Sequence, residues 1–380
     1  MTIRTAKTVL TIALVLGLAS QALASSPAEV INNFAFNAAR VLGRNQSTYF
    51  FSPYSIISAV AMAYAGASGN TAQEMQDVLG LSADIHAGIS DLMLGLSESG
   101  QVSSANRLWL CEGLDVNRDY QYNMLLSYGS RAIVLDIKDK PEESCKTINN
   151  WVNWMTKGRI PTLLDGLDPE TKMILTNAVY LSAEWQRKFR PYMTSPAEFR
   201  DGARVSEVQM MRQEGRFQFA ESDDVKVIRL PYAGQKLSMT VILPAEGKRL
   251  ELDAESLKKW REMLAVEMVD LWLPKFRTEE SYELADVFKA LGVRQAFTND
   301  ADFSGISTKE KLKIDAVIHK TFIDVNEERT EAAAATAVRM VGATAMPPEE
   351  MKEFHADHPF MYFITDDVTG TIIFMGRQTF

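Results

Sequence analysis

The sequence predicts a single α+β domain. Runs typical of strands and runs typical of helices occur along all 380 residues, neither strictly alternating nor gathered into separate halves, which favours an α+β fold. The chain is 46% apolar, enough to bury a large core. We find no glycine- or serine-rich linker, no internal repeat and no shift in composition, so we expect one domain rather than several.

Three segments have the pattern of helices. The first opens at Ser52 and Pro53, because proline suits an early helical position, and its apolar residues continue until Gly66. The other two are residues 148–157 and 282–291, the second of which is followed by a glycine. Glycine directly after the last turn is a common helix stop.

Strand signals are short runs rich in β-branched and aromatic residues. Such runs occupy residues 226–230, 237–243, 269–273, 322–325, 361–364 and 371–375. Three of the runs are closed by a proline, namely Pro231, Pro244 and Pro274. This is expected, because proline cannot donate a backbone hydrogen bond to a neighbouring strand.

The N-terminus has the pattern of a secretory signal. Two basic residues, Arg4 and Lys7, precede an apolar run over residues 9–18 and a small-x-small motif of the kind found before a cleavage point. The apolar run is well short of the roughly 20 residues that span a bilayer, which argues against a membrane anchor. We therefore expect residues 1–24 to be removed and residues 25–380 to be secreted or periplasmic.

The charge balance argues against a nucleic-acid partner. The chain has 40 basic and 49 acidic residues, a formal net charge of −9, and loss of Arg4 and Lys7 with the signal makes it more negative still. Surfaces that bind nucleic acid are basic. The two cysteines, Cys111 and Cys145, could form a disulfide in an exported protein, but two unpaired thiols agree at least as well with the sequence.

The sequence offers little for an enzyme or a metal site. A serine nucleophile needs a histidine and an orienting carboxylate, and the chain has 4 histidines but no GxSxG motif. His355, Asp357 and His358 lie on a strand-like segment without an HExxH helix. Asp300 and Asp302 resemble the start of a calcium loop whose terminal glutamate is missing. We expect no catalytic residue, no metal and no cofactor.

The most informative segment is residues 327–340, EERTEAAAATAVRM. Alanine is the best helix former, but this run has no apolar stripe at helical spacing. At a period of two, one face is uncharged and carries Thr330, Ala332, Ala334, Thr336, Val338 and Met340. The other face has both charges and carries Glu331, Ala333, Ala335, Ala337, Arg339 and Val341. Such a segment could enter a sheet as a new strand or lie outside as a solvated loop.

This segment and the run FHADHPFMYFI at residues 354–364 resemble the hinge and the closing motif of the reactive-centre loop in the serpin family. Further motifs recur in the family's order along the mature chain: SPYSIISAVAMAYAGASGNTAQEM (52–75), INNWVNWMTKGRIPTLL (148–164), LTNAVYLSAEWQRKF (175–189), LSMTVILP (237–244), LPKF (273–276) and VIHK (317–320). The chain is similar to serpins, secreted prokaryotic members in particular. The resemblance implies three β-sheets with surrounding helices and an exposed reactive-centre loop over about residues 327–353.

The resemblance implies a serine protease inhibitor that acts as a suicide substrate and not as an enzyme. The target protease would cleave the loop, form an ester with its carbonyl and be trapped as the cleaved loop inserts into the main sheet. The family's spacing from Glu327 places the scissile bond between Ala343 and Thr344, with Gly342 or Thr344 next in rank, then Met340, and Arg339 last. Ala343 suits an elastase-like or subtilisin-like protease, with a cysteine protease as a further option. We expect a monomer with no nucleic-acid or membrane partner.

The hinge gives an argument for inhibition and one against it. The resemblance assigns it to Glu327, Glu328, Arg329, Thr330, Glu331, Ala332, Ala333, Ala334 and Ala335. Thr330 and the four alanines keep the small side chains that insertion needs. Inhibitory serpins usually have glycine directly before the hinge threonine, where this chain has Arg329; a less flexible backbone there could slow insertion. The alternative is a non-inhibitory serpin that serves as a substrate or binding protein.

Five further residues match positions of the family's conformational switch. Ser52, Ser55, Asn177 and His319 correspond to the shutter, where the central strands part, and Trp185 to the breach, where the loop enters. A polar cluster below a sheet can form one hydrogen-bond network before insertion and another after it. Without the resemblance, each of the five would be interpreted as an ordinary buried residue.

Overall fold

The computed structural model describes residues 25–248, 252–330 and 350–380. The predicted signal, residues 1–24, and most of the predicted loop, residues 331–349, lie outside the described residues. Helices and strands are mixed along the described chain, so the α+β prediction is confirmed.

In the described ranges, the strands form three sheets. The five-stranded sheet has the order β11, β12, β4, β2, β3 and consists of Phe276–Glu283, Ala316–Val325, Met173–Leu181, Val102–Cys111 and Ile133–Leu135. The nine-stranded sheet has the order β1, β16, β15, β9, β8, β7, β10, β14, with β6 paired to β7, and consists of Tyr49–Phe51, Ile372–Gln378, Phe360–Asp366, Leu237–Pro244, Val225–Pro231, Arg204–Glu221, Ala265–Pro274, Lys352–His355 and Ser195–Asp201. The two-stranded sheet pairs β13 (Arg329–Thr330) with β5 (Ala183–Glu184).

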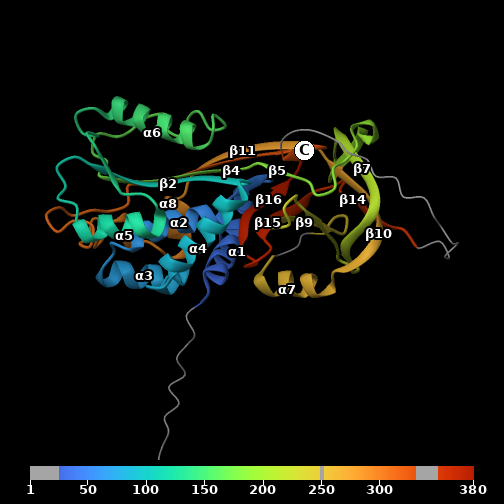
Figure 1. Ribbon diagram of the computed structural model, residues 1–380, viewed down its shortest axis with the longest axis horizontal. Helices are drawn as coiled ribbons and strands as arrows, with labels where there is room; N and C mark the ends of the chain where they lie inside the picture. The colour runs from blue at the N-terminus through green and yellow to red at the C-terminus, as the bar shows by residue number, and fades with distance from the viewer. Residues whose placement is uncertain (1–24, 249–251, 331–349) are drawn as a thin grey trace, which may run out of the picture.

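Helices cover both faces of the five-stranded sheet. The helices of the described chain are α1 Pro27–Asn45, α2 Pro53–Tyr64, α3 Gly69–Leu79, α4 Ile85–Ser99, α5 Arg118–Tyr128, α6 Pro141–Met155, α7 Ala254–Met263 and α8 Ala285–Leu291, with short 3-10 helices at Pro191–Met193 and Gln295–Phe297. Helix α6 lies over one face of the sheet, and α1 to α5 lie on the other side (Figure 1).

Two apolar clusters lie on the two sides of this sheet. Trp109 and Ala178 pack with Ile148 and Val152 of helix α6, whereas Val179 belongs to the main core. Because successive side chains of a strand point to opposite faces, β4 directs Ala178 toward α6 and its odd-numbered residues toward the main core. In a strand paired with β4, the residues opposite the odd-numbered residues of β4 would therefore face the main core.

The predicted first helix is confirmed. Ser52 is the N-cap of α2, its hydroxyl accepts a hydrogen bond from the Ser55 N–H at 3.2 Å, and Pro53 occupies the first turn. The helix ends at Tyr64, shortly before Gly66. The second predicted helix is α6, which begins earlier than expected.

The predicted helix over residues 282–291 is wrong at its start. Tyr282 lies in strand β11, opposite His319 of β12, and the helix α8 begins only at Ala285. Burial alternates along β11, which is the period of a strand, and pairing with β12 overrides the helical pattern of the sequence.

All six predicted strand segments lie in strands of the structure, within β8, β9, β10, β12, β15 and β16. Residue 371 alone falls one position before its strand. The three closing prolines are the last residues of β8, β9 and β10. The two cysteines are unpaired, with Cys145 buried and Cys111 half-buried. No helix in the described ranges is both long and apolar enough to cross a bilayer.

Candidate functional site

Two parallel neighbours meet at the centre of the five-stranded sheet. Strands β4 and β12 pair in parallel from Ala316 opposite Ile174 to Phe322 opposite Tyr180. Their outer neighbours, β2 and β11, run antiparallel to them. We call the contact of β4 with β12 the junction. The predicted loop begins directly after β12, so the junction lies beside its origin.

Buried polar side chains gather at the junction. The ring of His319 in β12 contacts the side-chain oxygen of Asn177 in β4, which stands opposite it in the register. The backbone N–H of Ser52 donates to His319 Nε2 at 3.0 Å, and Asn177 Nδ2 donates to the Ser55 hydroxyl. All four residues are fully buried. The structure thus brings together the four residues that the sequence assigns to the shutter.

His319 is neutral in this arrangement. A backbone N–H can only donate, so Nε2 accepts from Ser52 and the proton is on Nδ1, where it is donated to Asn177. Burial lowers the pKa of His319 to about 3, against the opposing effect of its hydrogen bond with Asn177. Protonation of Nε2 would place its N–H against the backbone N–H of Ser52, so that two donors would face each other.

Asn106 is a fifth member of this cluster that the sequence analysis missed. It lies opposite Asn177 in the pairing of β2 with β4, and its Oδ1 accepts from the Ser55 hydroxyl at 2.9 Å and from Asn177 Nδ2 at 2.5 Å. A polar residue at a spacing of two from the apolar Leu108 is the signal that could have located it. We call Ser52, Ser55, Asn106, Asn177 and His319 the polar cluster.

Trp185 holds the chain where it leaves β12. Its indole N–H donates to the backbone carbonyl of Asn326 at 2.9 Å, one residue after the end of the strand. The ring stacks on Tyr232 at a centroid distance of 4.6 Å and meets the edge of Phe189. Trp185 therefore contacts the start of the predicted loop and not the polar cluster.

Glu327, the first predicted hinge residue, is held on both carboxylate oxygens. The Thr194 hydroxyl donates to Oε1 at 2.8 Å, and the Lys275 ammonium lies 2.8 Å from Oε2. The Phe189 N–H donates to the Glu327 carbonyl at 2.9 Å. Burial opposes ionisation, but the hydrogen bonds from Lys275 and Thr194 outweigh it and lower the pKa of Glu327.

The chain then reverses direction. In the two-stranded sheet Arg329 stands opposite Glu184 and Thr330 opposite Ala183, and the pair is antiparallel. Because β5 continues β4, the chain at β13 already runs back along the strand that borders the junction. The remaining predicted hinge residues, Glu331 and Ala332 to Ala335, and the predicted scissile pair Ala343 and Thr344 lie outside the described residues.

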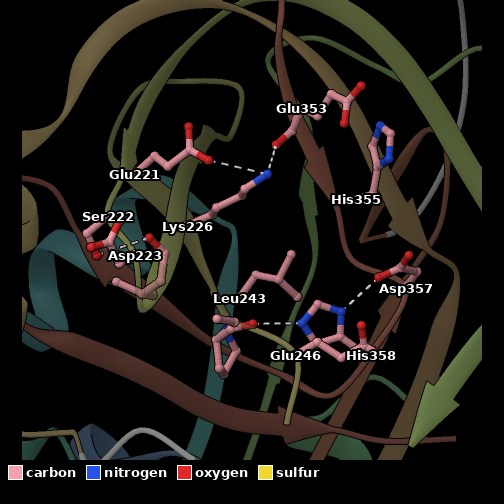
Figure 2. Close-up of a pocket in the computed structure, with 13 residues that line it drawn as sticks. Glu221, Ser222, Asp223, Lys226, Leu243, Glu246, Glu353, His355, Asp357 and His358 are labelled. Atoms are coloured by element: carbon pink, nitrogen blue, oxygen red, sulfur yellow. Dashed lines mark hydrogen bonds and ion pairs between the residues drawn. The ribbon is translucent and has the colours of Figure 1, made fainter. Parts of the chain in front are cut away.

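Strand β14 attaches the C-terminal side of the predicted loop. It pairs in parallel with β10 at the edge of the nine-stranded sheet. Phe354 is fully buried. The Lys226 ammonium donates to the Glu353 carbonyl at 3.0 Å and pairs with the Glu221 carboxylate at 3.4 Å (Figure 2). A buried ring and a lysine bridge thus fasten this short strand.

The two histidines near β14 are engaged with protein groups. His355 stacks on Trp272 at 4.0 Å, and its Nε2 lies 2.9 Å from the Asp270 carboxylate. The His358 ring lies between the Asp357 carboxylate and a backbone carbonyl, each at 2.7 Å (Figure 2). Burial lowers the pKa of His358, but the hydrogen bonds with these two acceptors raise it by more. The pKa of His358 therefore lies above its ordinary value. Within the described ranges, no three His, Cys, Asp or Glu side chains form a group that could hold a metal ion.

Comparisons with known proteins agree with this architecture. A family model described as "Serpin (serine protease inhibitor)" matches residues 29–379. A serpin-like protein of Thermococcus kodakarensis, described as uncharacterized, is 43% identical over 359 residues, which cover 92% of this chain and 84% of the relative. The leukocyte elastase inhibitor of Bos taurus is 38% identical over 348 residues, covering 86% of this chain and 92% of the inhibitor.

Solved structures share the fold. The structure of a tumour suppressing serpin has a TM-score of 0.84 at 27% identity and covers 93% of this chain and 99% of its own. Uncleaved ovalbumin has a TM-score of 0.82 at 27% identity, with coverage of 93% and 99%. The sheet order, the family match and these two likenesses agree over nearly the whole length. The chain belongs to the serpin family and has its α+β fold.

Proposed function

We propose that this chain is an exported inhibitor of serine endopeptidases that traps its target as a suicide substrate. The observation that carries the proposal is β13, whose two residues already run antiparallel to β5 beside the junction. Support also comes from the family's description as serine protease inhibitors and from the relative named leukocyte elastase inhibitor. Opening of β4 from β12 would give the cleaved loop a place between them.

The pairing of β13 with β5 supports one register for the inserted strand. Thr330 stands opposite Ala183, so each step toward the C-terminus of the loop moves one residue back along β5 and β4. Continued without a bulge, this register places Thr336 opposite Asn177 and Met340 opposite Met173. The inserted segment then follows the whole length of β4.

The same register accounts for the two faces of the loop sequence. Residues directly opposite each other in an antiparallel pair share a face, so Thr336 faces the polar cluster together with Asn177. By the period of two, the uncharged face from Thr330 to Met340 meets the main core. Glu331 and Arg339 fall on the face that Ala178 directs toward α6. The charges thus stay out of the main core, as insertion requires.

Insertion releases enough free energy to displace a bound protease. About ten new backbone hydrogen bonds at about 1 kcal/mol net each give on the order of 10 kcal/mol, comparable to the stability of a whole domain. Serpin loop insertion is itself an established example of strain released by proteolysis. The intact chain is then held by a kinetic barrier.

The covalent step uses the chemistry of the protease. Its serine oxygen attacks the carbonyl carbon of Ala343, the bond to the Thr344 nitrogen breaks, and that nitrogen leaves as an amine after accepting a proton. Insertion removes the ester from the deacylating geometry. Ala343 fits the small primary pocket of an elastase-like or subtilisin-like enzyme. Residues 1–24 direct the chain out of the cytoplasm, and the inhibitor acts as a monomer in the periplasm or outside the cell.

A second function is favoured by Arg329. It occupies the position where inhibitory serpins usually have glycine, and insertion that is too slow gives the ester time to hydrolyse. The chain would then be a non-inhibitory serpin, cleaved as a substrate or acting through binding.

The test is to mix the protein with pancreatic elastase and with subtilisin and to analyse the products on denaturing gels and by mass spectrometry. Inhibition predicts a band at the summed mass that survives boiling, and a released peptide that begins at Thr344. Clean cleavage of the loop without an adduct would support the substrate function instead.

A further inference from the structure

The two strands of the junction are also tied together at the end far from the hinge. Strand β4 begins at Met173 and β12 at Ala316, and Asp315 stands directly before β12. The Asp315 Oδ2 accepts from the backbone N–H of Lys172 at 2.7 Å and from that of Met173 at 3.0 Å. The Asp315 N–H donates to the Met173 carbonyl at 2.9 Å. We call these three hydrogen bonds the far-end clasp.

The clasp uses a carboxylate that is largely shielded from water. The Asp315 side chain is 17% exposed. Its Oδ1 takes no part in the clasp and lies 3.8 Å from the Lys313 ammonium, beyond the distance of a hydrogen bond. Hydrogen bonds to a carboxylate are stronger than those between neutral groups. The clasp therefore resists separation of β4 from β12 at this end, as the polar cluster does in the middle of the junction.

Insertion of the loop along the whole length of β4 has to break the clasp. In the register supported by β13, Met340 stands opposite Met173. The N–H and the carbonyl of Met173 both point toward β12 in the intact chain, because both bond to Asp315. In an antiparallel pair, a residue in this orientation exchanges both backbone hydrogen bonds with the residue opposite. Met340 would therefore take the two backbone groups of Met173 from Asp315.

A cavity of about 700 Å³ lies over this end of the junction. Ile174 of β4 and Ala316 and Ile318 of β12 line it, and Asp315 lines it as well. Ile318 packs in the apolar cluster beneath α6, so Ala316, two residues before it, lies on the same side of the sheet. Ile174 stands opposite Ala316 in the parallel register. The cavity thus opens on the α6 side of the place where β4 and β12 would part.

The proposed register directs Arg339 into this cavity. Arg339 stands opposite Ile174, on the face of the loop that turns toward α6. Separation of the two strands without slippage would bring Arg339 between Ile174 and Ala316. Leu164 and Leu167 also line the cavity and can cover the methylene stem of the arginine.

Other charged side chains line the cavity, and Asp315 suits Arg339 best among them. The set consists of three lysines and three carboxylates, namely Lys172, Lys311, Lys313, Asp168, Glu170 and Asp315. Insertion removes the backbone donors of Asp315, and it leaves this carboxylate in need of new ones. A guanidinium binds a carboxylate through two parallel hydrogen bonds, which an ammonium cannot do. Arg339 is therefore a better partner than Lys313 for the released carboxylate.

We propose that Asp315 exchanges partners during inhibition. It ties β4 to β12 in the intact chain and forms an ion pair with Arg339 once the cleaved loop has inserted. This inference rests on the proposed function, because the pair forms only where insertion reaches Met340. The new pair compensates for the hydrogen bonds that opening of the far end removes. It accounts for a cation at the end of a loop segment whose residues 332–338 are all uncharged.

A double-mutant cycle of Asp315→Asn and Arg339→Gln tests the proposal. Each protein is cut once in the loop by elastase, and the melting temperatures of the intact and cut forms are compared. Arg339→Gln should change the intact form by less than about 1 °C and lower the melting temperature of the cut form by about 2 to 5 °C, because an ion pair is lost. In the Asp315→Asn background the same substitution should change the cut form by less than about 1 °C, because the pair is already absent. Asparagine keeps an acceptor for the backbone N–H groups, so the intact Asp315→Asn protein should fold.

Two matched variants test the assignment of the partners. Glu331→Gln neutralises a charge on the same face of the loop at the other end of β4, and its effect on the cut form should not depend on Asp315. Glu170→Gln removes another carboxylate that lines the cavity, and it should not reduce the effect of Arg339→Gln. Additive effects of Asp315→Asn and Arg339→Gln would overturn the proposal, and so would coupling of Arg339 to Glu170 instead.

The same measurements separate this proposal from the proposed function. A cut parent protein that melts at the temperature of the intact one would contradict insertion and, with it, the ion pair. A cut parent that melts at a higher temperature, together with additive effects of the two substitutions, would leave insertion standing and overturn the ion pair alone.

Discussion

The predicted reactive-centre loop lies between two strands of opposite character. Strand β12, before the loop, is an interior strand flanked by β4 and β11. Strand β14, after the loop, is an edge strand that pairs with β10 alone in the described sheet. Under the proposed mechanism, the first attachment is the one that can accept a new strand, because its neighbour β4 can re-form hydrogen bonds with the loop. The second attachment, β14, has only to keep its pairing with β10.

The side chains at the two attachments also differ in the kind of contact they make. At β12 the polar cluster joins three strands, β2, β4 and β12, and the start of α2 through hydrogen bonds, which can be exchanged for others. At β14 the ring of Phe354 is fully buried in the core. Under the proposed mechanism, the hydrogen-bonded cluster lies at the part that would move, and the buried aromatic ring at the part that would stay fixed. The predictions below test this difference.

The largest effect is expected from charge on the core-facing side of the loop. Thr336→Arg would bury an unpaired cation beside the polar cluster, at a cost of several kcal/mol, and should turn the inhibitor into a substrate. The matched variant Ala337→Arg places the same charge on the side where Arg339 already lies. The number of inhibitor molecules consumed per elastase should rise at least about tenfold for Thr336→Arg and much less for Ala337→Arg. Equal behaviour of the two would refute the proposed register.

Removal of the anchor of β14 comes second. Phe354→Ala should lower the free energy of unfolding of the intact protein by about 3 to 5 kcal/mol, because it leaves a cavity in the core. Met351→Ala, at a half-exposed site directly before β14, should change it by less than about 0.5 kcal/mol. Chemical denaturation followed by tryptophan fluorescence measures both. A small effect of Phe354→Ala would mean that the main anchor lies elsewhere.

The two attachments should respond to pH in opposite directions. The pKa of His319 is about 3 in the folded protein, below its ordinary value of 6.5, so its contribution to stability is present above pH 6.5 and is lost as the pH falls. That loss amounts to about 2 kcal/mol at pH 5. The pKa of His358 is raised, so its contribution is present at low pH and is lost as the pH rises through the folded value.

This prediction is tested by measuring the free energy of unfolding between pH 5 and pH 8. The proteins compared are the parent protein, His319→Gln and His358→Gln. The parent should lose stability relative to His319→Gln on acidification and gain it relative to His358→Gln. Parallel curves for all three proteins would show that neither histidine has the environment described here.

The smallest effect is expected at the start of the hinge. Arg329→Gly restores the backbone freedom found in inhibitory serpins, and a difference of about 0.5 to 1 kcal/mol in the barrier corresponds to a change of about twofold to fivefold. Fewer inhibitor molecules should be cleaved per protease trapped. An unchanged ratio in the elastase titration would show that Arg329 does not limit insertion.

Much of the site could be predicted from the sequence, and what was missed depends on long-range pairing. The motifs located four members of the polar cluster, but not Asn106, whose role follows from its position opposite Asn177 across two strands. The period of two predicts two faces for the loop sequence, but it does not tell which of them would meet the core in the proposed insertion. That choice requires the pairing of Thr330 with Ala183, between segments far apart in the chain. Tyr282 was assigned to a helix for the same reason, since its partner β12 lies elsewhere in the sequence.

The central claim, that the cleaved loop inserts beside β4, is tested most directly by thermal unfolding before and after a single cut in the loop. Insertion predicts that the cut protein melts at a temperature higher by on the order of 10 °C or more, and that cut Thr336→Arg does not. An unchanged melting temperature of the cut parent protein, with the cut mapped to the Ala343–Thr344 bond, would contradict the account.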